Sequence, residues 1–555
     1  MNRSLRVWAP DAHRVDVVVG AEEQTAARES HGWWRGPRLH EGDLYWIRID
    51  GGPPRPDPRS TFQPQGVHGP SCWLDTATLG APGPAPYVSL RDAVIYELHV
   101  GTFTQAGTFS SAVEHLDDLV ELGVTHVELM PIAQFPGVHG WGYDGVDLYA
   151  AHTPYGGPPG LRDLIAECHA RGLAVIIDVV HNHFGPEGAY LAGIAPYKTS
   201  HHITPWGDAI NLDDVGSDEV RRFLIDSAIA WLRDFGADGL RLDALHALYD
   251  DSEHHFVEQL VDEVRVLERD LDRRFVLIGE YDHHDPKVLI EWGLDAHWND
   301  DFHHAVHALV TGEHDSYYVD FVGKLGTVLE HGYALDGGFS KFRGERHGRP
   351  FGALSRDRLV AYVQSHDQVG NRPRGERLHQ LAGFKRAQLA AALLLTSPFV
   401  PMLFQGEEWA ASTPFLYFAQ LESEQLRRAV REGRRKEHRH DGVTPPDPEA
   451  PSTRDASVLR WRERGEGEHA QMLAWYRTLI AARRAHPALR DPSPEATRVE
   501  EHGGLLTVHR DDLALVCNFT KEPRRMLAGE LLVASSGSHA AHELSGLACA
   551  LVRRR

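Results

Sequence analysis

Residues 238–246 read DGLRLDALH, an apolar run that carries an arginine and an aspartate two residues apart. Side chains of a β-strand alternate between its two faces. Leu240 and Leu242 therefore share one face, and Arg241 and Asp243 share the other. An apolar strand that points a cation and a carboxylate to the same side holds either a structural ion pair or a working site. The rest of the chain decides between these two interpretations.

Similar strand-like runs recur along the chain, separated by segments of helix length. The eight runs begin at Ala93, Val124, Leu173, Asp238, Arg274, Leu294, Arg358 and Phe399. Intervening segments such as SAVEHLDDLVELG and LRDLIAECHARG carry helical patterns and end in glycine, a helix C-cap signal. Eight strands that alternate with helices predict a parallel (β/α)8 TIM barrel. The alternative is an open doubly wound sheet, which is disfavoured because no GxGxxG motif opens a helix after the first strand.

Strand-rich segments flank the predicted barrel, so the 555-residue chain is expected to be multidomain. The alternating runs RVDVVV and DLYWIRID, followed by Pro-rich linkers, predict an N-terminal immunoglobulin-like β-sandwich in residues 1–85, similar to a carbohydrate-binding module. The barrel is assigned to residues 86–488 and ends with the helix HAQMLAWYRTLIAARRAHPAL. The short runs LLTVHR, LALVCNF and GELLVAS predict a small C-terminal β-domain in residues 489–555.

Charge and targeting signals narrow the class of protein. The formal net charge of −22 disfavours nucleic acid and anionic membrane surfaces as partners and fits a neutral substrate. No apolar run of 18 residues exists, and the start MNRSLRVWAPDAHRV lacks the apolar core of a signal peptide, so we predict a cytoplasmic protein. The four cysteines lie far apart and show neither metal-ligand spacing nor a disulfide framework.

The polar residues that end the apolar runs are the candidate site, because the chemistry of such barrels sits at the carboxyl ends of the strands. They are Asp178, Asn182 and His183 after the third run, Arg241, Asp243 and His246 at the fourth, Glu280 after the fifth, and His366 and Asp367 after the seventh. Three carboxylates, Asp243, Glu280 and Asp367, are thus expected at one mouth. A structural salt-bridge network accounts poorly for all three.

Two carboxylates that flank a bond are the arrangement used for glycoside hydrolysis. Arg241 beside Asp243 is expected to keep that carboxylate ionised. Glu280 follows the apolar run FVLIG, and partial desolvation there is expected to raise its pKa, as a general acid requires. The pattern therefore predicts a glycosidase with Asp243 and Glu280 in different protonation states.

No metal or cofactor is predicted for the catalytic step. The HExxH signature is absent, and the His-rich stretches HNH, YDHHD and DDFHHAVH lack dedicated ligand spacing, so they are interpreted as sugar-contacting or core histidines. A structural calcium ion near Asn182 stays an open alternative.

Two aromatic clusters follow predicted barrel strands and are candidate sugar subsites. GWGYD supplies Trp141 and Tyr143 beside Asp144, and TPFLYF supplies Phe415, Tyr417 and Phe418. Aromatic faces stack on the apolar faces of sugar rings. The alternative is that either cluster belongs to the hydrophobic core.

The strand-end motifs resemble the four signature regions of the α-amylase superfamily. DVVHNH, GLRLDALH, the IGE that ends at Glu280, and SHDQ occur in the order of that superfamily. The resemblance implies that Asp243 is the nucleophile, Glu280 the acid/base and Asp367 the stabiliser of the distorted sugar. It also implies that Arg241, His183 and His366 hold the sugar in the −1 subsite, and that Tyr143 stacks on it.

Longer segments resemble the maltooligosyltrehalose trehalohydrolase family more closely. They are RVWAPDAHRVDVVV, FPGVHGWGYDGV, HNHFGPEGAYL, HWNDDFHHAVHALVTGEHDSYYVDF, SHDQVGNR, MLFQGEEWAASTPFLYF and GRRKE. This resemblance implies hydrolysis of the α-1,4 bond next to the terminal trehalose of maltooligosyltrehalose. It implies maltooligosyltrehalose and related α-1,4-glucans as substrates, and a maltooligosyltrehalose synthase as metabolic partner. The chain departs from the family at AQLESEQL, which follows TPFLYF, and at His438, where the family tends to have phenylalanine.

Two other functions stay open at this point. A glycogen branching enzyme would share the sandwich, the barrel and the three carboxylates, but the FHHAVH and PFLYF contexts are similar to trehalohydrolases instead. A non-catalytic glucan-binding protein would be expected to have lost one of the carboxylates, and none is lost.

The two-step mechanism of the superfamily implies retained configuration at the anomeric carbon and a carboxylate separation of about 5–5.5 Å.

Overall fold

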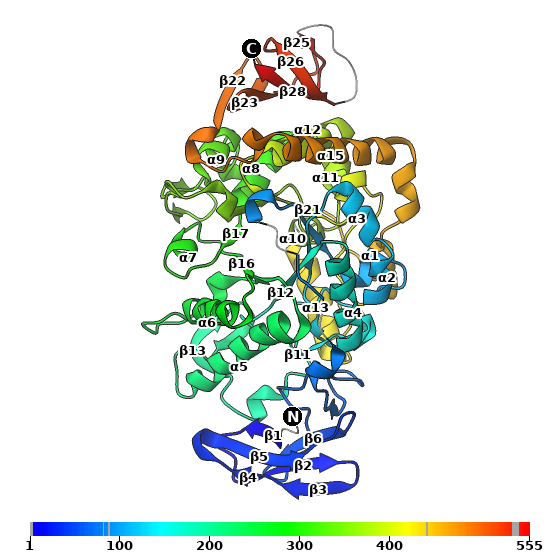
Figure 1. Ribbon diagram of the computed structural model, residues 1–555, viewed down its shortest axis with the longest axis vertical. Helices are drawn as coiled ribbons and strands as arrows, with labels where there is room; N and C mark the ends of the chain where they lie inside the picture. The colour runs from blue at the N-terminus through cyan, green and yellow to red at the C-terminus, as the bar shows by residue number, and fades with distance from the viewer. Residues whose placement is uncertain (1–3, 81–82, 87–88, 440–441, 536–542, 555) are drawn as a thin grey trace.

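Eight parallel strands close into a barrel at the centre of the computed structural model, which describes residues 4–80, 83–86, 89–439, 442–535 and 543–554 (Figure 1). The strands are β8 (Ile95–Leu98), β9 (His126–Leu129), β12 (Ala174–Val179), β15 (Gly239–Leu242), β16 (Val276–Gly279), β17 (Ala296–Trp298), β20 (Leu359–Tyr362) and β21 (Val400–Phe404). Each pairs with the next in this order, and β21 pairs with β8. Every strand lies within one of the eight predicted runs, so the predicted barrel is confirmed.

The alternation predicted around Arg241 determines what lies inside and outside the barrel. Apolar side chains from several strands, including Ile95, Ile176 and Trp298, meet in one interior cluster. Leu240 and Leu242 belong instead to the main core between the strands and the surrounding helices. The Arg241 guanidinium lies over the Trp298 ring, 4.2 Å from its centroid, which places Arg241 on the inner face.

Helices cover the outside of the barrel between successive strands. They include α3 (Leu116–Leu122), α4 (Gly157–Ala170), α5 (Ser217–Ile229), α6 (Phe256–Leu271), α8 (Asp300–Thr311) and α12 (Phe384–Thr396). The predicted glycine cap of the first helical segment is confirmed, since Gly123 ends α3 with a φ of 104°. Further along, α15 (Gly467–Ala485) packs against α12, and its buried residues include Met472, Trp475, Leu479 and Ile480.

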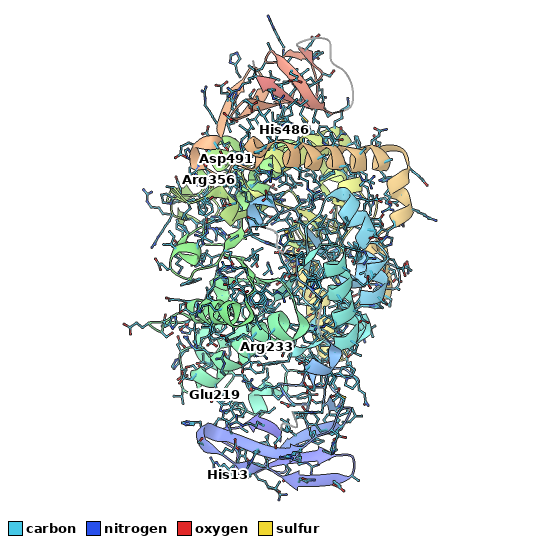
Figure 2. The ribbon with its side chains drawn as sticks, in the orientation of Figure 1. His13, Glu219, Arg233, Arg356, His486 and Asp491 are labelled. Carbon is cyan, nitrogen blue, oxygen red and sulfur yellow. The ribbon has the colours of Figure 1, made fainter. Side chains whose placement is uncertain are left out.

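Two antiparallel sheets precede the barrel and lie at one end of the elongated molecule (Figure 1). One contains β1 (Ser4–Trp8), β5 (Trp33–Arg38) and β4 (Ala27–Arg28), and the other β3 (Glu22–Thr25), β2 (Val15–Val19), β6 (Leu44–Ile49) and β7 (Ser71–Cys72). The Trp33 indole donates a hydrogen bond of 2.9 Å to Glu219 of α5, which Figure 2 labels on the barrel side of this junction. This contact holds the predicted sandwich against the barrel.

A five-stranded sheet forms the opposite end of the molecule (Figure 1). Its order is β22 (Arg498–His502), β23 (Leu505–Arg510), β24 (Leu513–Asn518), β28 (Ala548–Arg554) and β26 (Gly529–Ala534). The backbone of Arg356 donates 2.8 Å to the Pro492 carbonyl near the barrel junction, where Figure 2 labels Arg356, His486 and Asp491. The domain boundaries at residues 85 and 488 stay a prediction, and the second falls within the turn Pro487–Arg490.

The structure also shows whether any described helix could span a membrane and how the four cysteines lie. Within the described residues no helix combines the length and apolar character needed to cross a membrane. Cys72, Cys168, Cys517 and Cys549 are free and buried. Cys517 of β24 and Cys549 of β28 are direct cross-strand neighbours, although the sequence separates them widely.

Candidate active site

The catalytic carboxylates predicted from the sequence follow the carboxyl ends of their strands. Asp243 comes directly after β15 and donates its backbone N–H to the Val179 carbonyl at 3.1 Å. Glu280 comes directly after β16 and donates to the Leu242 carbonyl at 3.0 Å. These bonds extend the parallel ladder by one residue, so both side chains leave the barrel at the same end.

A single buried guanidinium links the carboxylates. Arg241 Nη1 donates to Asp243 Oδ1 at 2.7 Å and to Asp178 Oδ2 at 2.8 Å. Its Nη2 donates to Glu280 Oε2 at 2.7 Å. The pairing of Arg241 with Asp243 noted in the sequence is therefore both an ion pair and part of a larger site, because the same cation also holds a carboxylate from a different strand.

The two carboxyl groups that share Arg241 have pKa values moved in opposite directions. Burial alone would raise the pKa of Asp243, but Arg241, His183 and the amide of Asn182 lower it below its ordinary value. Burial raises the pKa of Glu280 to about 8, and Arg241 offsets this only in part. The site thus favours an ionised Asp243 beside a protonated Glu280, as the sequence predicted.

The backbone directly after Asp243 adopts an unusual conformation. Ala244 has a φ of 41° and a ψ of 54°, in the left-handed region that costs a non-glycine residue of the order of 1–3 kcal/mol. Its N–H donates 3.0 Å to Glu280 Oε2, and the Leu245 N–H donates 2.9 Å to the Glu280 carbonyl. The turn therefore fixes the segment after Asp243 against Glu280.

Asp243 has a second positioning partner on the loop that follows β12. Asn182 Nδ2 donates 2.9 Å to Asp243 Oδ2, the oxygen that Arg241 leaves free. His183 Nε2 donates 2.9 Å to the Tyr143 carbonyl, and its ring stacks on Trp206 with centroids 4.7 Å apart. Asn182 was noted in the sequence as a strand-end residue, whereas Trp206, between β13 (Lys198–Thr204) and β14 (Gly207–Ile210), carried no signal.

Tyr143 and His366 form another part of the site through a stacked pair of rings. The Tyr143 hydroxyl donates 2.7 Å to Asp178 Oδ2, and its ring stacks on His366 with centroids 5.0 Å apart. His366 opens α10 (His366–Gly370), and its backbone N–H donates 2.9 Å to Glu97 Oε2. Burial alone would lower the pKa of His366, but the Glu97 carboxylate, 2.5 Å from Nδ1, raises it to about 9.

Asp367 is the third predicted carboxylate and the most open of them. Its side chain is 41% exposed, and its Oδ1 lies 3.6 Å from His366 Nε2. Asn371 Nδ2 donates 3.0 Å to the same oxygen. Asp367 is therefore tethered from two sides while one face of its carboxylate meets solvent.

A cleft of about 920 Å³ opens beside two of the three carboxylates, Glu280 and Asp367. It is lined by Glu280 and Asp367 together with Asp282, Asp300, His304, Tyr317, Phe342, Arg343, Asn371, Arg372 and the predicted residue His246, among others. His438, at the point where the sequence departs from the trehalohydrolase pattern, also lines it. The cleft is large enough for several sugar rings, since ligand pockets typically span about 300–1,000 Å³.

The aromatic residues predicted as subsites lie mainly beneath the site. Trp141, Phe415 and Phe418 are buried in one cluster, with Tyr417 partly buried against it. Trp141 and Phe415 stack with centroids 5.2 Å apart, and the Trp141 indole donates 2.9 Å to the Leu416 carbonyl. Direct contact of these aromatic residues with a sugar stays a prediction, and their burial does not support it. They pack against Tyr143 and His366, as expected if they belong to the hydrophobic core.

Asp144 is another predicted binding residue, and it follows Tyr143 directly in the chain. Burial raises the pKa of Asp144 to about 6, with a smaller contribution from Glu449. Its part in substrate binding also stays a prediction.

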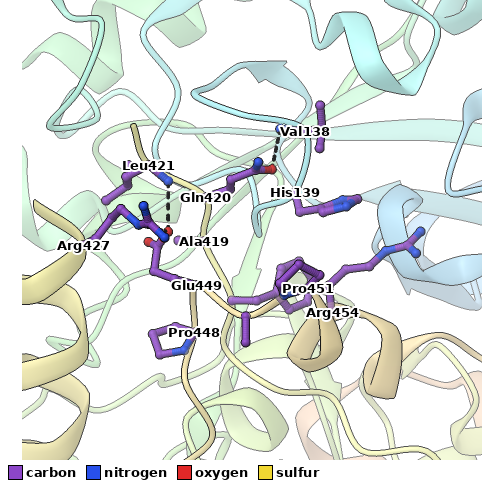
Figure 3. Close-up of a pocket in the computed structure, with 12 residues that line it drawn as sticks. Val138, His139, Ala419, Gln420, Leu421, Arg427, Pro448, Glu449, Pro451 and Arg454 are labelled. Carbon is purple, nitrogen blue, oxygen red and sulfur yellow. Dashed lines mark hydrogen bonds and ion pairs between the residues drawn. The ribbon is translucent and has the colours of Figure 1, made fainter. Parts of the chain in front are cut away.

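A second, smaller pocket of about 320 Å³ lies beside the loop that carries Trp141 (Figure 3). Figure 3 shows Arg427 and Glu449 on one side and Val138, His139 and Arg454 on the other. None of the predicted catalytic carboxylates lines it. The larger cleft is therefore the candidate active site.

Two glutamates inside the barrel, Glu97 and Glu128, were not predicted as site residues from the sequence. Glu97 and Glu128 interrupt the apolar runs of β8 and β9 and are buried. Glu97 holds His366, whereas neither side-chain oxygen of Glu128 has a hydrogen-bond partner. Burial raises the pKa of Glu128 well above its ordinary value. A carboxylate within an apolar strand run was the available signal, and it is the same signal that identified Asp243.

The chain is similar to a known catalytic-domain family, to curated enzymes and to a solved structure. Residues 89–203 match the family model of the alpha amylase catalytic domain. A malto-oligosyltrehalose trehalohydrolase from Arthrobacter ramosus is 44% identical, with 100% of both chains covered. One from Saccharolobus solfataricus is 40% identical over 96% of this chain and 94% of its own. A crystal structure from Salmonella typhimurium, provisionally assigned as an alpha amylase, is 36% identical, has a TM-score of 0.91 and covers 99% of this chain and 97% of its own.

Proposed function

Because this chain belongs to the malto-oligosyltrehalose trehalohydrolase family, we propose that its reaction runs on Asp243, Glu280 and Asp367 at the mouth of the barrel. The protein is a glycosidase that releases trehalose from maltooligosyltrehalose. The observation that supports the proposed residue roles is the shared contact of Arg241 with Asp243 and Glu280, whose pKa values move apart.

In the first step Asp243 attacks the anomeric carbon on the non-trehalose side of the scissile α-1,4 bond. Glu280, protonated because burial raises its pKa to about 8, gives its proton to the departing 4-oxygen of trehalose. A maltooligosyl ester of Asp243 forms, and free trehalose leaves. Arg241 and Asn182 hold both oxygens of Asp243, so the attack needs little reorientation of the carboxylate.

In the second step the ionised Glu280 takes a proton from water, which attacks the same anomeric carbon and releases Asp243. Two inversions give a maltooligosaccharide with retained α configuration. The carboxylate separation that this route requires is about 5–5.5 Å. Asp243 and Glu280 both contact the guanidinium of Arg241. This shared contact supports the shorter separation over the ~6.5–9.5 Å range of inverting enzymes.

The remaining polar groups are proposed to bind the glucosyl ring that carries the reacting carbon. His366 and Asp367 are adjacent on α10, and their side chains lie 3.6 Å apart. Both are placed to contact neighbouring hydroxyl groups, and the exposed face of Asp367 is the part that substrate can reach. Tyr143, which stacks on His366, supplies an aromatic face beside them.

The broader setting of the reaction is also a proposal. We place a maltooligosyltrehalose synthase as the enzyme class that supplies the substrate. We assign the chain to the cytoplasm, because its four described cysteines are free, as is usual in a reducing compartment.

The residue roles are tested by product analysis with maltooligosyltrehalose beside plain maltooligosaccharide. Asp243→Asn should abolish trehalose release, because the amide cannot form the ester, while substrate binding by calorimetry persists. Asp357→Asn is the matched control, since Asp357 precedes β20 at the opposite end of the barrel and should leave turnover intact. Turnover by Asp243→Asn at the wild-type rate would refute the assignment.

Glu280 is tested by changing the leaving group. Glu280→Gln should lose activity on maltooligosyltrehalose but retain formation of the ester from a maltooligosyl fluoride, because fluoride departs without a proton. Equal loss on both substrates would indicate that Glu280 is not the acid.

A further inference from the structure

A cluster of metal-ligating side chains stands at the rim of the active-site cleft, outside the three catalytic carboxylates. Asp282 and His284 follow β16 by three and five residues, and His347 follows β19 (Glu345–Arg346) of the small hairpin formed with β18 (Phe339–Ser340). Each residue offers one ligand atom, and these atoms lie within 4.8 Å of one another. Two imidazoles and one carboxylate are a ligand set suited to zinc and related transition metals.

We propose that Asp282, His284 and His347 form a binding site for one Zn²⁺ ion at the cleft rim. The two histidines come from segments more than 60 residues apart, and the fold brings them together at ring centroids 4.9 Å apart. Three protein ligands leave a coordination position for water, which is the arrangement of an open zinc site.

The histidine at the centre of the site is oriented by a buried carboxylate. His284 Nε2 lies 2.9 Å from Asp301 Oδ1, and Asp301 is fully buried. Asp301 is itself held by the Ala334 N–H at 2.6 Å. Both ring nitrogens of His284 are buried without a hydrogen-bond partner among the described residues, so the contact of Nε2 with Asp301 is an ion pair and Nδ1 has no partner of either kind there. A carboxylate behind one imidazole nitrogen with the other nitrogen unused is the outer-shell pattern of a metal-binding histidine.

The second histidine is oriented in a similar way by a backbone group. His347 Nε2 donates 2.8 Å to the Asp282 carbonyl, so its Nδ1 is left as the atom with a lone pair. The same contact ties His347 to the residue whose carboxylate completes the set. Both imidazoles are thus held by hydrogen-bond or ion-pair partners before any ion arrives.

Backbone contacts fix the two segments against each other. The Arg349 N–H donates 2.9 Å to the His284 carbonyl, and the His347 N–H donates 3.0 Å to the Gly338 carbonyl. Gly348 has a φ of +80°, and a Cβ there would lie 1.9 Å from the Leu335 carbonyl oxygen, so only glycine allows this approach. The ligands are therefore preorganised, which reduces the entropy lost on binding.

Arg343 forms an ion pair with the carboxylate of Asp282. Its Nη2 donates to both oxygens of Asp282 at 2.7 Å. An incoming ion must therefore displace the guanidinium from Asp282. Zn²⁺ and Arg343 are thus in competition for Asp282, and removal of the guanidinium should strengthen zinc binding.

Zinc binding is expected to affect the rate of trehalose release. This effect rests on the proposed function, whereas the binding of zinc does not. Arg343 and Phe342 line the cleft beside Glu280. An ion that takes Asp282 from Arg343 frees this side chain at the rim of the cleft. The rate of trehalose release should therefore change as the site fills.

The test is calorimetric titration of the chelator-treated full-length protein with ZnCl₂. We expect one strong site per chain in the wild type, and a dissociation constant at least about tenfold weaker in His347→Ala, because even changes behind a ligand cost about 10–100-fold. Arg343→Met should bind more tightly than the wild type. The matched control is His283→Ala, since His283 is on the same loop, but its imidazole belongs to no ligand group in the described part of the chain.

The possible results separate the site from background binding by this His-rich chain. His347 is only partly buried, so His347→Ala is expected to fold, which circular dichroism checks. No strong site in the wild type, or identical isotherms for wild type and His347→Ala, would overturn the proposal. Zinc binding without any change in trehalose release would retain the site and refute only its link to the cleft.

Discussion

Glu97 provides the sharpest test of how the barrel interior controls the active site. Its carboxylate contacts both Nδ1 and the backbone N–H of His366, and it raises the pKa of His366 from 6.5 to about 9 against the effect of burial. That difference corresponds to about 3 kcal/mol of preference for the imidazolium. With Nδ1–H directed to Glu97, only the imidazolium also carries a proton on Nε2, the nitrogen that faces Asp367.

Glu97→Gln keeps the shape of the side chain and removes its charge. The pKa of His366 should then fall to 6.5 or below, because burial remains, so that at most about a tenth of the molecules carry the imidazolium at pH 7.5. If Nε2–H must donate to the sugar, kcat/KM at pH 7.5 should fall by at least about tenfold and recover as the pH is lowered. In the wild type the imidazolium persists up to about pH 9.

The assay is the pH profile of kcat/KM for trehalose release between pH 4.5 and 8, with folding checked by circular dichroism at each pH. Glu121→Gln is the matched control, because Glu121 is an exposed residue of α3 paired with Arg477. A Glu97→Gln profile that parallels the wild type would refute the reasoning. A loss of the same size at every pH would point to a positioning effect of Glu97 without control of the His366 proton.

Three further outcomes are expected. In the wild type, kcat/KM should fall about tenfold per pH unit above about pH 8, because Glu280 must be protonated and its pKa is raised to about 8; a profile flat to pH 9.5 would contradict this. Arg241→Lys should lower kcat by at least about 100-fold, because a single ammonium cannot reproduce the fork that contacts both Asp243 and Glu280; single-turnover kinetics check it, and a loss below fivefold would contradict it. Tyr143→Phe should lower kcat/KM by about 10–100-fold, the worth of a hydrogen bond to a charged group, without a change in circular dichroism; an unchanged rate would show that the bond to Asp178 is not needed.

The barrel and the position of the three proposed catalytic carboxylates after their strands were predictable, because both depend on local pattern. Each strand lies in an apolar run, and the residues that follow the runs point to the same end of a parallel barrel. Alternation along the run predicted that Arg241 faces away from Leu240 and Leu242, and the structure places Arg241 over Trp298 inside the barrel and both leucines in the outer core. These inferences need only the period of a strand and the direction of the chain.

Features that depend on contacts between distant segments could not be predicted in the same way. The Tyr143 ring stacks on His366, and His347 meets His284, yet no spacing in the sequence links either pair. The sequence also could not distinguish an aromatic subsite from core, since TPFLYF fits both, and Phe415 and Phe418 are buried. Burial of a given side chain is decided by what other segments cover it.

The central claim is that Asp243 forms a covalent bond with the maltooligosyl unit while Glu280 supplies and removes the proton. The most direct measurement is mass spectrometry of Glu280→Gln after incubation with a maltooligosyl fluoride and acid quenching. We predict a mass increase of one maltooligosyl unit that peptide mapping locates on Asp243. An unmodified protein that nevertheless hydrolyses the fluoride, or an adduct on any other residue, would contradict the claim.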